Sequence, residues 1–164
     1  MSEYHNTKAE DRVPLGQKLA VGAGGFPIQN GGLIVQYMAQ PIFQIFLGLN
    51  PALFGLAMTI PRIWDAFTDP VMGRISDRTQ SRYGRRRPYV FFGALAVALT
   101  FLTIWMVPQS MGDTGTFLWL TIGSVLFFTA FTVFSVPFNA LVYEQTPDYH
   151  ERTRLMFYLA LFYN

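Results

Sequence analysis

The sequence contains no cysteine, which excludes disulfide bonds, thiolate metal sites and S-acylation. Charged residues are also few: they make up 13% of the 164 residues, whereas soluble globular domains usually carry about 25%. Residues 1–16 lack the apolar core of a signal peptide, and Ser2 excludes N-myristoylation. The sequence lacks a basic helix face with interleaved aromatic residues, which is typical of nucleic-acid binding, so we expect no nucleic-acid partner.

Long runs without charge make up most of the chain, which is 51% hydrophobic. Four of these runs are long enough to cross about 30 Å of hydrocarbon as helices, which takes about 20 residues each. They do not show the alternation of apolar and polar residues that is typical of barrel strands. We therefore predict an all-α membrane protein. Its predicted transmembrane helices cover about 19–47, 52–75, 89–107 and 116–142, and the start of a fifth covers 155–164.

Prolines and polar residues mark where these helices begin and bend. Asn50 is a good N-cap, and Pro51 suits the first helical position after it. Pro27 and Pro41 lie inside the first segment, where they predict kinks of the kind that transmembrane helices tolerate.

The fifth segment reaches the last residue, Asn164, after about ten residues, which is too short to span a bilayer. We therefore expect the chain to be a fragment of a longer protein. In this interpretation residues 1–16 form an N-terminal tail, and residues 17–164 form part of a transmembrane bundle.

Positive charges lie on alternate connections. Of the 12 Lys and Arg residues, all except Arg62 lie before the first segment, from the end of the second to the start of the third, or after the fourth. The connections around Asn50 and Asp113 carry none. The positive-inside rule therefore predicts a multi-pass protein with a cytoplasmic N-terminus and a cytoplasmic loop between the second and third helices.

The second segment carries charges at membrane depth. Asp65 and Asp69 are four residues apart, so they share one helix face, which Arg62 joins. Charges inside a membrane are costly and usually face a cavity or pair internally. One interpretation is a cation site, for Na⁺ or for protons, in which Thr68 is a further candidate ligand. The other is a structural pair of Arg62 with Asp65, which would leave Asp69 unpaired.

Neutral polar residues lie on two other segments. On the fourth, Thr132, Ser135 and Asn139 share one face, and Thr132 and Ser135 fall near the depth of the two aspartates. They either complete a coordination shell or form hydrogen bonds between helices. On the first, glutamines and an asparagine suit either a hydroxylated solute or helix packing; they are Gln29, Asn30, Gln36, Gln40 and Gln44.

The loop between the second and third segments is rich in arginine. It sets topology and attracts anionic lipid, but that role does not explain the acidic Asp77 among the arginines. The arginines of this loop are Arg74, Arg78, Arg82, Arg85, Arg86 and Arg87.

The run from Gly73 through Asp77 and Arg78 to Gly84, Arg85 and Arg86 resembles the loop motif of the major facilitator superfamily. Together with the run from Arg62 to Pro70 and the stretches 136–141 and 147–154, it is similar to the glycoside–pentoside–hexuronide:cation symporter family, the melibiose permease-like branch. The resemblance covers nearly the whole chain from Leu15. It implies the first helices of the N-terminal six-helix bundle of a twelve-helix transporter, in a plasma membrane such as the bacterial inner membrane.

The resemblance also implies roles for single residues. Asp65 and Asp69 match the family's cation-coordinating carboxylates, Thr132 a hydroxyl at that site, and Arg62 an arginine near both the cation and the solute. The gating motif, which latches the two halves of such transporters, matches Gly73, Asp77, Arg78, Gly84, Arg85 and Arg86.

The solute side departs from the family pattern. Its sugar-binding aspartates on helices one and four align with Gln29 or Asn30 and with Ser135, and its arginine early in helix five is missing here. We therefore list Arg62, Gln29, Asn30, Ser135 and Asn139 as candidate substrate-binding residues.

We expect a non-enzymatic, cation-coupled symporter of a small solute, a sugar or glycoside, with no catalytic residues and no cofactor besides the coupling Na⁺ or H⁺. Its partners are then the bilayer, the solute and the remaining helices of the full-length transporter. The alternatives are a lipid or lysolipid transporter of a related branch, which the 16 phenylalanines allow, and a non-transporting membrane interaction protein.

Overall fold

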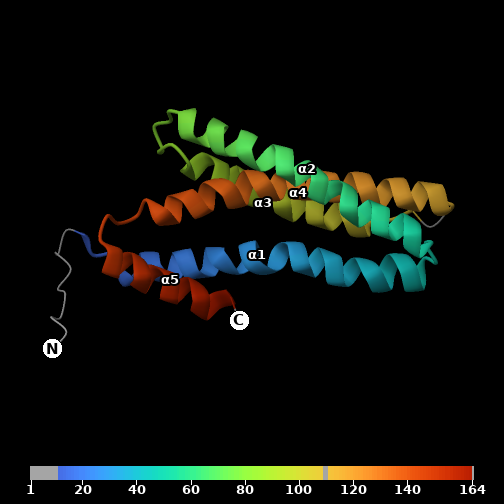
Figure 1. Cartoon of the computed structure of the whole chain (residues 1–164), viewed down its shortest axis with the longest axis horizontal. Helices are drawn as coiled ribbons and strands as arrows, with labels where there is room; N and C mark the ends of the chain where they lie inside the picture. The colour runs from blue at the N-terminus through green and yellow to red at the C-terminus, as the bar shows by residue number, and fades with distance from the viewer. Residues whose placement is uncertain (1–10, 109–110, 164) are drawn as a thin grey trace. The chain divides into compact units, whose positions relative to one another are not determined.

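The computed structural model of the chain describes residues 11–108 and 111–163, so residues 1–10 of the predicted tail and Asn164 lie outside the described residues. Within this part the ordered elements are helices, with no strand (Figure 1). They are α1 (Leu15–Ala39), a π-helical turn η2 (Gln40–Phe46), α2 (Pro51–Arg78), α3 (Arg87–Trp105), α4 (Asp113–Tyr143) and α5 (Tyr149–Tyr163).

The chain forms two compact units, which are described separately. One contains the chain up to Gly31 together with residues 139–164, and the other contains residues 32–138. The first unit therefore holds the N-terminal part of α1, the end of α4 and α5. The second holds the end of α1, η2, α2, α3 and most of α4.

Capping side chains set two helix starts. Asn50 Oδ1 accepts a hydrogen bond of 2.8 Å from the amide of Ala52, and Pro51 follows as the first helical residue, which confirms the predicted start. Asp148 Oδ1 accepts hydrogen bonds from the amides of His150 (2.7 Å) and Glu151 (3.2 Å). Because of this cap, α5 begins at Tyr149, earlier than the position 155 that the apolar run alone predicts.

The first predicted helix is not α-helical over its whole length. It changes from α to π at Gln40, and Pro41 lies at the start of the π segment. A proline has no N–H and its ring clashes with the carbonyl four residues earlier, so a local π adjustment accommodates it. The wider turn is visible where the amide of Leu47 donates to the carbonyl of Ile42 over 3.0 Å.

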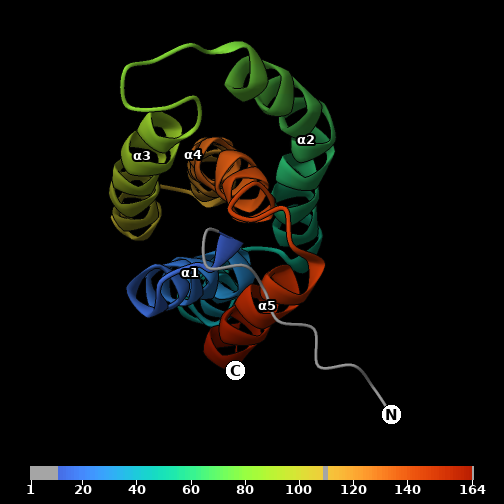
Figure 2. The same ribbon diagram turned by 90° about the vertical axis from the view of Figure 1, so that its left-hand side faces the viewer.

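Helix α4 packs against both α2 and α3 in the second unit, and Figures 1 and 2 show the three helices side by side. A side chain at Gly93 on α3 would lie 2.8 Å from the backbone of Phe134 on α4, so only glycine permits this approach. The indole of Trp119 donates to the carbonyl of Ile104 over 3.3 Å. The buried core of this unit is apolar and rich in phenylalanine; it includes Val35, Phe43, Ile104, Leu120, Phe127 and Phe128.

By length and composition, two helices among the described residues are apolar enough to cross a membrane, namely α3 and α4. Helices α1 and α2, with 25 and 28 residues, are also long enough. Their amides, glycines and charged residues make them less apolar. The remaining membrane crossings therefore stay predictions from the sequence.

Candidate functional site

The contact between α2 and α4 joins two of the predicted cation ligands. The hydroxyl of Thr132 donates a hydrogen bond of 2.8 Å to Oδ1 of Asp69. Thr132 is buried. The predicted depth match between the fourth helix and the aspartates is therefore correct for this pair. No described residue donates a hydrogen bond to the hydroxyl oxygen of Thr132 or to the second carboxylate oxygen of Asp69, so both lone pairs of the hydroxyl and that oxygen are available as ligands.

Asp65 lies one turn before Asp69 on α2, and its Oδ1 is buried. No described residue donates a hydrogen bond to this oxygen. A buried carboxylate oxygen without a partner is costly, and such a group in a native structure needs an explanation. Repulsion from the Asp69 carboxylate adds to this cost.

Arg62 does not supply the missing partner. Its guanidinium lies over the ring of Phe128 on α4, 5.1 Å from the centroid, which is within the range of a cation–π interaction. No ion pair joins Arg62 to Asp65 within the described part of the chain, although the charge of Arg62 still attracts the carboxylate at longer range. The structure therefore does not support the alternative of a structural ion pair between Arg62 and Asp65.

A second side-chain bond fixes α2 against α4 near this position. The indole of Trp64 donates to the hydroxyl of Thr129 over 2.9 Å, and Thr129 precedes Thr132 by three residues on the same face of α4. Thr129 was not among the predicted site residues, although that spacing was a usable signal. The predicted ligand Thr68 instead donates to carbonyls of its own helix, at Trp64 (3.3 Å) and Asp65 (3.5 Å).

Arg62 also borders a cavity of about 250 Å³ in the second unit. Its lining combines the polar residues Gln36, Thr59 and Arg62 with the apolar residues Val35, Met58 and Phe128. Gln36 belongs to the predicted amide stripe of the first helix. The contribution of Phe128 could not be anticipated, because an aromatic residue on an apolar helix is indistinguishable from a core residue in the sequence.

The other predicted substrate residues fall into two groups. Ser135 is buried on α4 in the second unit. Gln29, Asn30 and Asn139 belong to the first unit, where the amide of Asn30 donates to the carbonyl of Phe26 over 3.2 Å. Within the second unit the structure therefore brings together Asp69 with Thr132, and Arg62 with Gln36. No group of three or more His, Asp or Glu residues that could hold a metal occurs in the described ranges.

Residues of the predicted gating motif contact one another between the end of α2 and the start of α3. Asp77 pairs with Arg86, whose side chain is nearly buried. Next to this pair, the hydroxyls of Thr79 and Tyr89 lie 2.7 Å apart. Gly84 has φ +98°, a conformation that favours glycine, which explains this motif residue. Asp77 therefore has a partner within its own loop, and a contact with the other half of a transporter stays a prediction.

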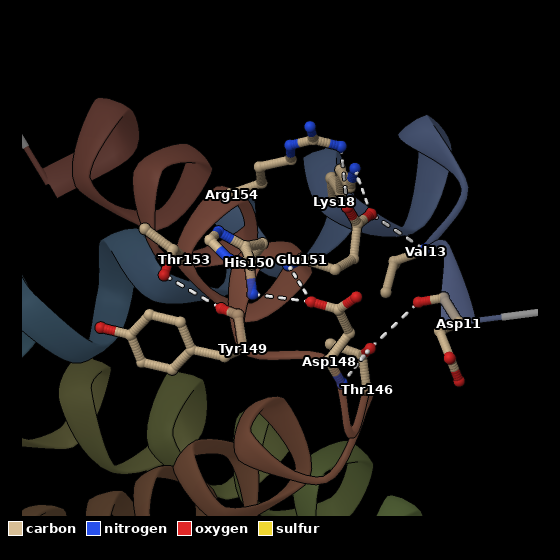
Figure 3. Close-up of polar contacts among 10 residues, drawn as sticks. All are labelled: Asp11, Val13, Lys18, Thr146, Asp148, Tyr149, His150, Glu151, Thr153 and Arg154. Atoms are coloured by element: carbon tan, nitrogen blue, oxygen red, sulfur yellow. Dashed lines mark hydrogen bonds and ion pairs between the residues drawn. The ribbon is translucent and has the colours of Figure 1, made fainter. Parts of the chain in front are cut away.

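The first unit contains a fully buried carboxylate, Glu151 at the start of α5 (Figure 3). Its Oε1 accepts a hydrogen bond of 3.0 Å from the amide of Val13 and pairs with the ammonium of Lys18 at 2.5 Å. Its Oε2 lies 3.4 Å from the guanidinium of Arg154. Close by, the hydroxyl of Thr146 donates to the carbonyl of Asp11 over 3.0 Å.

Glu151 precedes the apolar run from Leu155, and its charge is well compensated. Burial alone would raise the pKa of its carboxyl group. The hydrogen bonds from Lys18 and Val13 and the charges of Lys18 and Arg154 outweigh burial and hold the pKa below its ordinary value of 4.5. This cluster joins the segment before α1 to the beginning of α5 and has the character of a structural site.

Known proteins match most of this chain. The profile of the family described as MFS/sugar transport protein matches residues 20–164. The uncharacterized symporter sll1374 of Synechocystis is 36% identical over 144 residues, or 84% of this chain and 26% of that protein. Sodium-dependent lysophosphatidylcholine symporter 1 of Gallus gallus is 30% identical over 146 residues, or 88% of this chain and 27% of that protein.

A third relative has a different named solute. YagG of Escherichia coli (strain K12), provisionally named a glycoside/cation symporter, is 29% identical over 149 residues, or 89% of this chain and 31% of that protein. The chain thus spans about a quarter to a third of the length of these three relatives.

Proposed function

The chain belongs to the MFS/sugar transport protein family, and from this premise we propose that the protein containing it is a secondary active transporter that moves a small solute together with a cation. Membership of this family supports a transporter rather than an enzyme. Three relatives of this chain carry the word symporter in their names. The coupling cation of this protein, Na⁺ or H⁺, is part of the proposal.

The observation that carries the proposal is the unpartnered buried oxygen of Asp65 one turn from the Asp69–Thr132 bond. Two carboxylates and a hydroxyl are hard oxygen ligands, which suit Na⁺. A bound cation would supply the charge that Arg62 does not supply by direct contact. A proton on one of the two carboxylates would serve the same purpose, because it removes one negative charge and adds a donor.

Coupling then follows from the position of the site between two helices. A cation that binds Asp65 and Asp69 on α2 and the Thr132 hydroxyl on α4 favours the conformation in which α2 and α4 are close. Solute binding can shift the same equilibrium, since a ligand favours whichever state it binds more tightly. Transporters of this kind alternate access by moving one bundle against another around a midplane site.

For the solute we propose a sugar or glycoside, bound at the cavity bordered by Arg62, Gln36 and Thr59. Amide, guanidinium and hydroxyl groups suit sugar hydroxyls, and YagG carries glycoside in its name. The second candidate is a lysolipid. It is favoured by the apolar lining residues of the same cavity, Val35, Met58 and Phe128, and by the lysophosphatidylcholine symporters among the relatives.

The test is solute uptake by the full-length protein in proteoliposomes, with and without a Na⁺ gradient and with and without a pH gradient. A panel of radiolabelled glycosides and lysophosphatidylcholine separates the two solute classes. Asp65→Asn and Asp69→Asn should each abolish cation-dependent uptake, while downhill exchange of solute can survive. Asp113→Asn at the exposed start of α4 is the matched control and should transport normally.

Wild-type cation dependence in both Asp65→Asn and Asp69→Asn would refute the cation site. No uptake of any solute by the unmodified protein, under any gradient, would instead favour the non-transporting alternative.

A further inference from the structure

The loop between α2 and α3 forms an open pocket of about 790 Å³ that the transport proposal does not use. Its walls come from the loop residues Arg82 and Tyr83 and from Arg87, Phe91 and Phe92 at the start of α3. This volume falls within the range of about 300–1,000 Å³ of small-molecule sites. The pocket thus combines two cationic groups with three aromatic rings.

The two arginines that border the pocket have no anionic partner among residues 11–108 and 111–163. Arg82 lies over the ring of Tyr83, 4.6 Å from its centroid, and neither Arg82 nor Arg87 forms an ion pair with any residue that the structure describes. Arg86 differs, because it is paired with Asp77 and nearly buried. Guanidinium groups bind phosphate oxygens through paired hydrogen bonds, so two unpaired ones at one pocket favour a phosphate ligand.

The apolar side of the pocket continues along α3. Phe91 and Phe92 are 63% and 67% exposed and pack edge to face with centroids 5.5 Å apart. At intervals of four, four and three residues, exposed leucines follow Phe91 on the same helix face, at Leu95, Leu99 and Leu102. By length and composition α3 is apolar enough to cross a membrane, and in a membrane-spanning α3 this stripe would lead from the pocket into the hydrocarbon.

We propose that this pocket binds an anionic phospholipid of the cytoplasmic leaflet, with the phosphate between Arg82 and Arg87 and an acyl chain along the α3 stripe. Tyr83, Phe91 and Phe92 lie at the headgroup level, where aromatic rings are favoured. A soluble phosphorylated partner would have no use for the leucine stripe, so a lipid fits the combination better. The proposal goes beyond the general attraction of a basic loop to a membrane, because it names two of the six arginines of the loop as the site.

The experiment measures lipid binding to the purified full-length protein by native mass spectrometry at physiological ionic strength. Phosphatidylglycerol is titrated against phosphatidylcholine of the same acyl chains. The double variant Arg82→Gln/Arg87→Gln should lose affinity for phosphatidylglycerol on the order of 100-fold, since each charge-assisted hydrogen bond contributes roughly tenfold or more. Binding of phosphatidylcholine should be weak in the unmodified protein and unchanged in the variant.

The matched control is Arg74→Gln/Arg78→Gln, which removes the same charge from the adjacent end of α2, outside the pocket. It should lose about fivefold or less, because attraction between exposed charges is screened by salt. An equal loss in both double variants would mean diffuse attraction only and would overturn the proposal. Equal affinity of the unmodified protein for both lipids would overturn it as well.

A measurement on the unmodified protein keeps the test decisive if the variants fold poorly. Photoactivatable phosphatidylglycerol should crosslink to the peptide 82–102, and an excess of soluble glycerol phosphate should not compete. Crosslinks spread evenly over all basic segments would contradict a defined site. Full competition by glycerol phosphate would show that the pocket recognises a soluble phosphate and not a lipid.

Discussion

The two compact units each contain a carboxylate with a buried oxygen, in opposite surroundings: Glu151 is buried as a whole, and Asp65 is half-buried with its Oδ1 buried. Glu151 in the first unit is fully buried and has Lys18, Arg154 and the Val13 amide as partners. Asp65 in the second unit has a buried oxygen that no described residue contacts through a hydrogen bond. The partners of Glu151 offset the free-energy cost of desolvating its charge. At Asp65 the free-energy cost of burying an oxygen without a hydrogen bond is not offset.

The difference shows how the same chemical group, a carboxylate, can serve structure or function. A satisfied ion cluster holds two segments together and gains nothing from a further ligand. A carboxylate without a hydrogen-bonding partner destabilises the folded state until a ligand binds it. The stability of the folded protein therefore depends on the ligand concentration. Strain or unpaired polar groups that persist in a fold are for this reason good indicators of a site.

The largest expected stability effect follows from removing a partner of Glu151. Lys18→Met should lower the free energy of unfolding of the full-length protein by about 3 kcal/mol, because it leaves a buried carboxylate undercompensated. Thermal unfolding in detergent measures this. Adding Glu151→Gln should recover part of the loss, since the double variant has neither charge. Gln17→Met on the same exposed turn is the control and should have little effect. A double variant less stable than Lys18→Met would contradict the buried pairing.

The second prediction applies the comparison to ligand dependence. Sodium at about 100 times its dissociation constant should stabilise the unmodified protein by about 2.7 kcal/mol, through binding to the folded state only. Asp65→Asn should abolish this gain without destabilising the sodium-free protein, whereas Glu151→Gln should keep the gain and lower the baseline. Melting curves in NaCl against choline chloride measure both. Loss of the sodium gain in Glu151→Gln but not in Asp65→Asn would reverse the assignment of the two sites.

The third prediction concerns acid. Because the pKa of Glu151 is lower in the folded state than its ordinary 4.5, its contribution to stability is present above that pH and is lost as the pH falls through the folded-state pKa. Between pH 7 and 5 the contribution should therefore be constant. The difference in melting temperature between the unmodified protein and Glu151→Gln, followed from pH 7 to 3, measures this. A difference in melting temperature that shrinks already between pH 7 and 5 would contradict a lowered pKa of Glu151.

The smallest effect is expected at the hydroxyl of the cation site. Thr132→Val keeps the shape and removes the donor to Asp69, which should cost about 1 kcal/mol and weaken sodium activation of uptake by roughly fivefold. Thr121→Val is the matched control, because the Thr121 hydroxyl donates only to the carbonyl of Phe117 in its own helix, over 2.8 Å. Equal sodium activation constants in the two variants would exclude Thr132 as a ligand.

Several features of the fold and the site followed from local sequence. The all-helical structure follows from long apolar runs, the start of α2 from Asn50 and Pro51, and family membership from the stretch between Arg62 and Pro88. The match in depth between Thr132 and Asp69 followed from the rise of a helix per residue. The start of α5 at Tyr149 was missed, because an apolar pattern does not report a helix end that a polar cap extends.

What the sequence by itself determined is which residues share a helix face, since helical periodicity depends only on spacing along the chain. Asp65, Asp69 and Arg62 were therefore placed on one face correctly, and they stand as the candidate site. Only the tertiary structure decided which of them find partners. In the packing of α4 on α2, Thr132 contacts Asp69 and the ring of Phe128 contacts Arg62, while the buried Oδ1 of Asp65 receives no hydrogen bond from any described residue. Contacts between helices depend on side chains far apart in the sequence, and no local pattern specifies which of two equivalent carboxylates they satisfy.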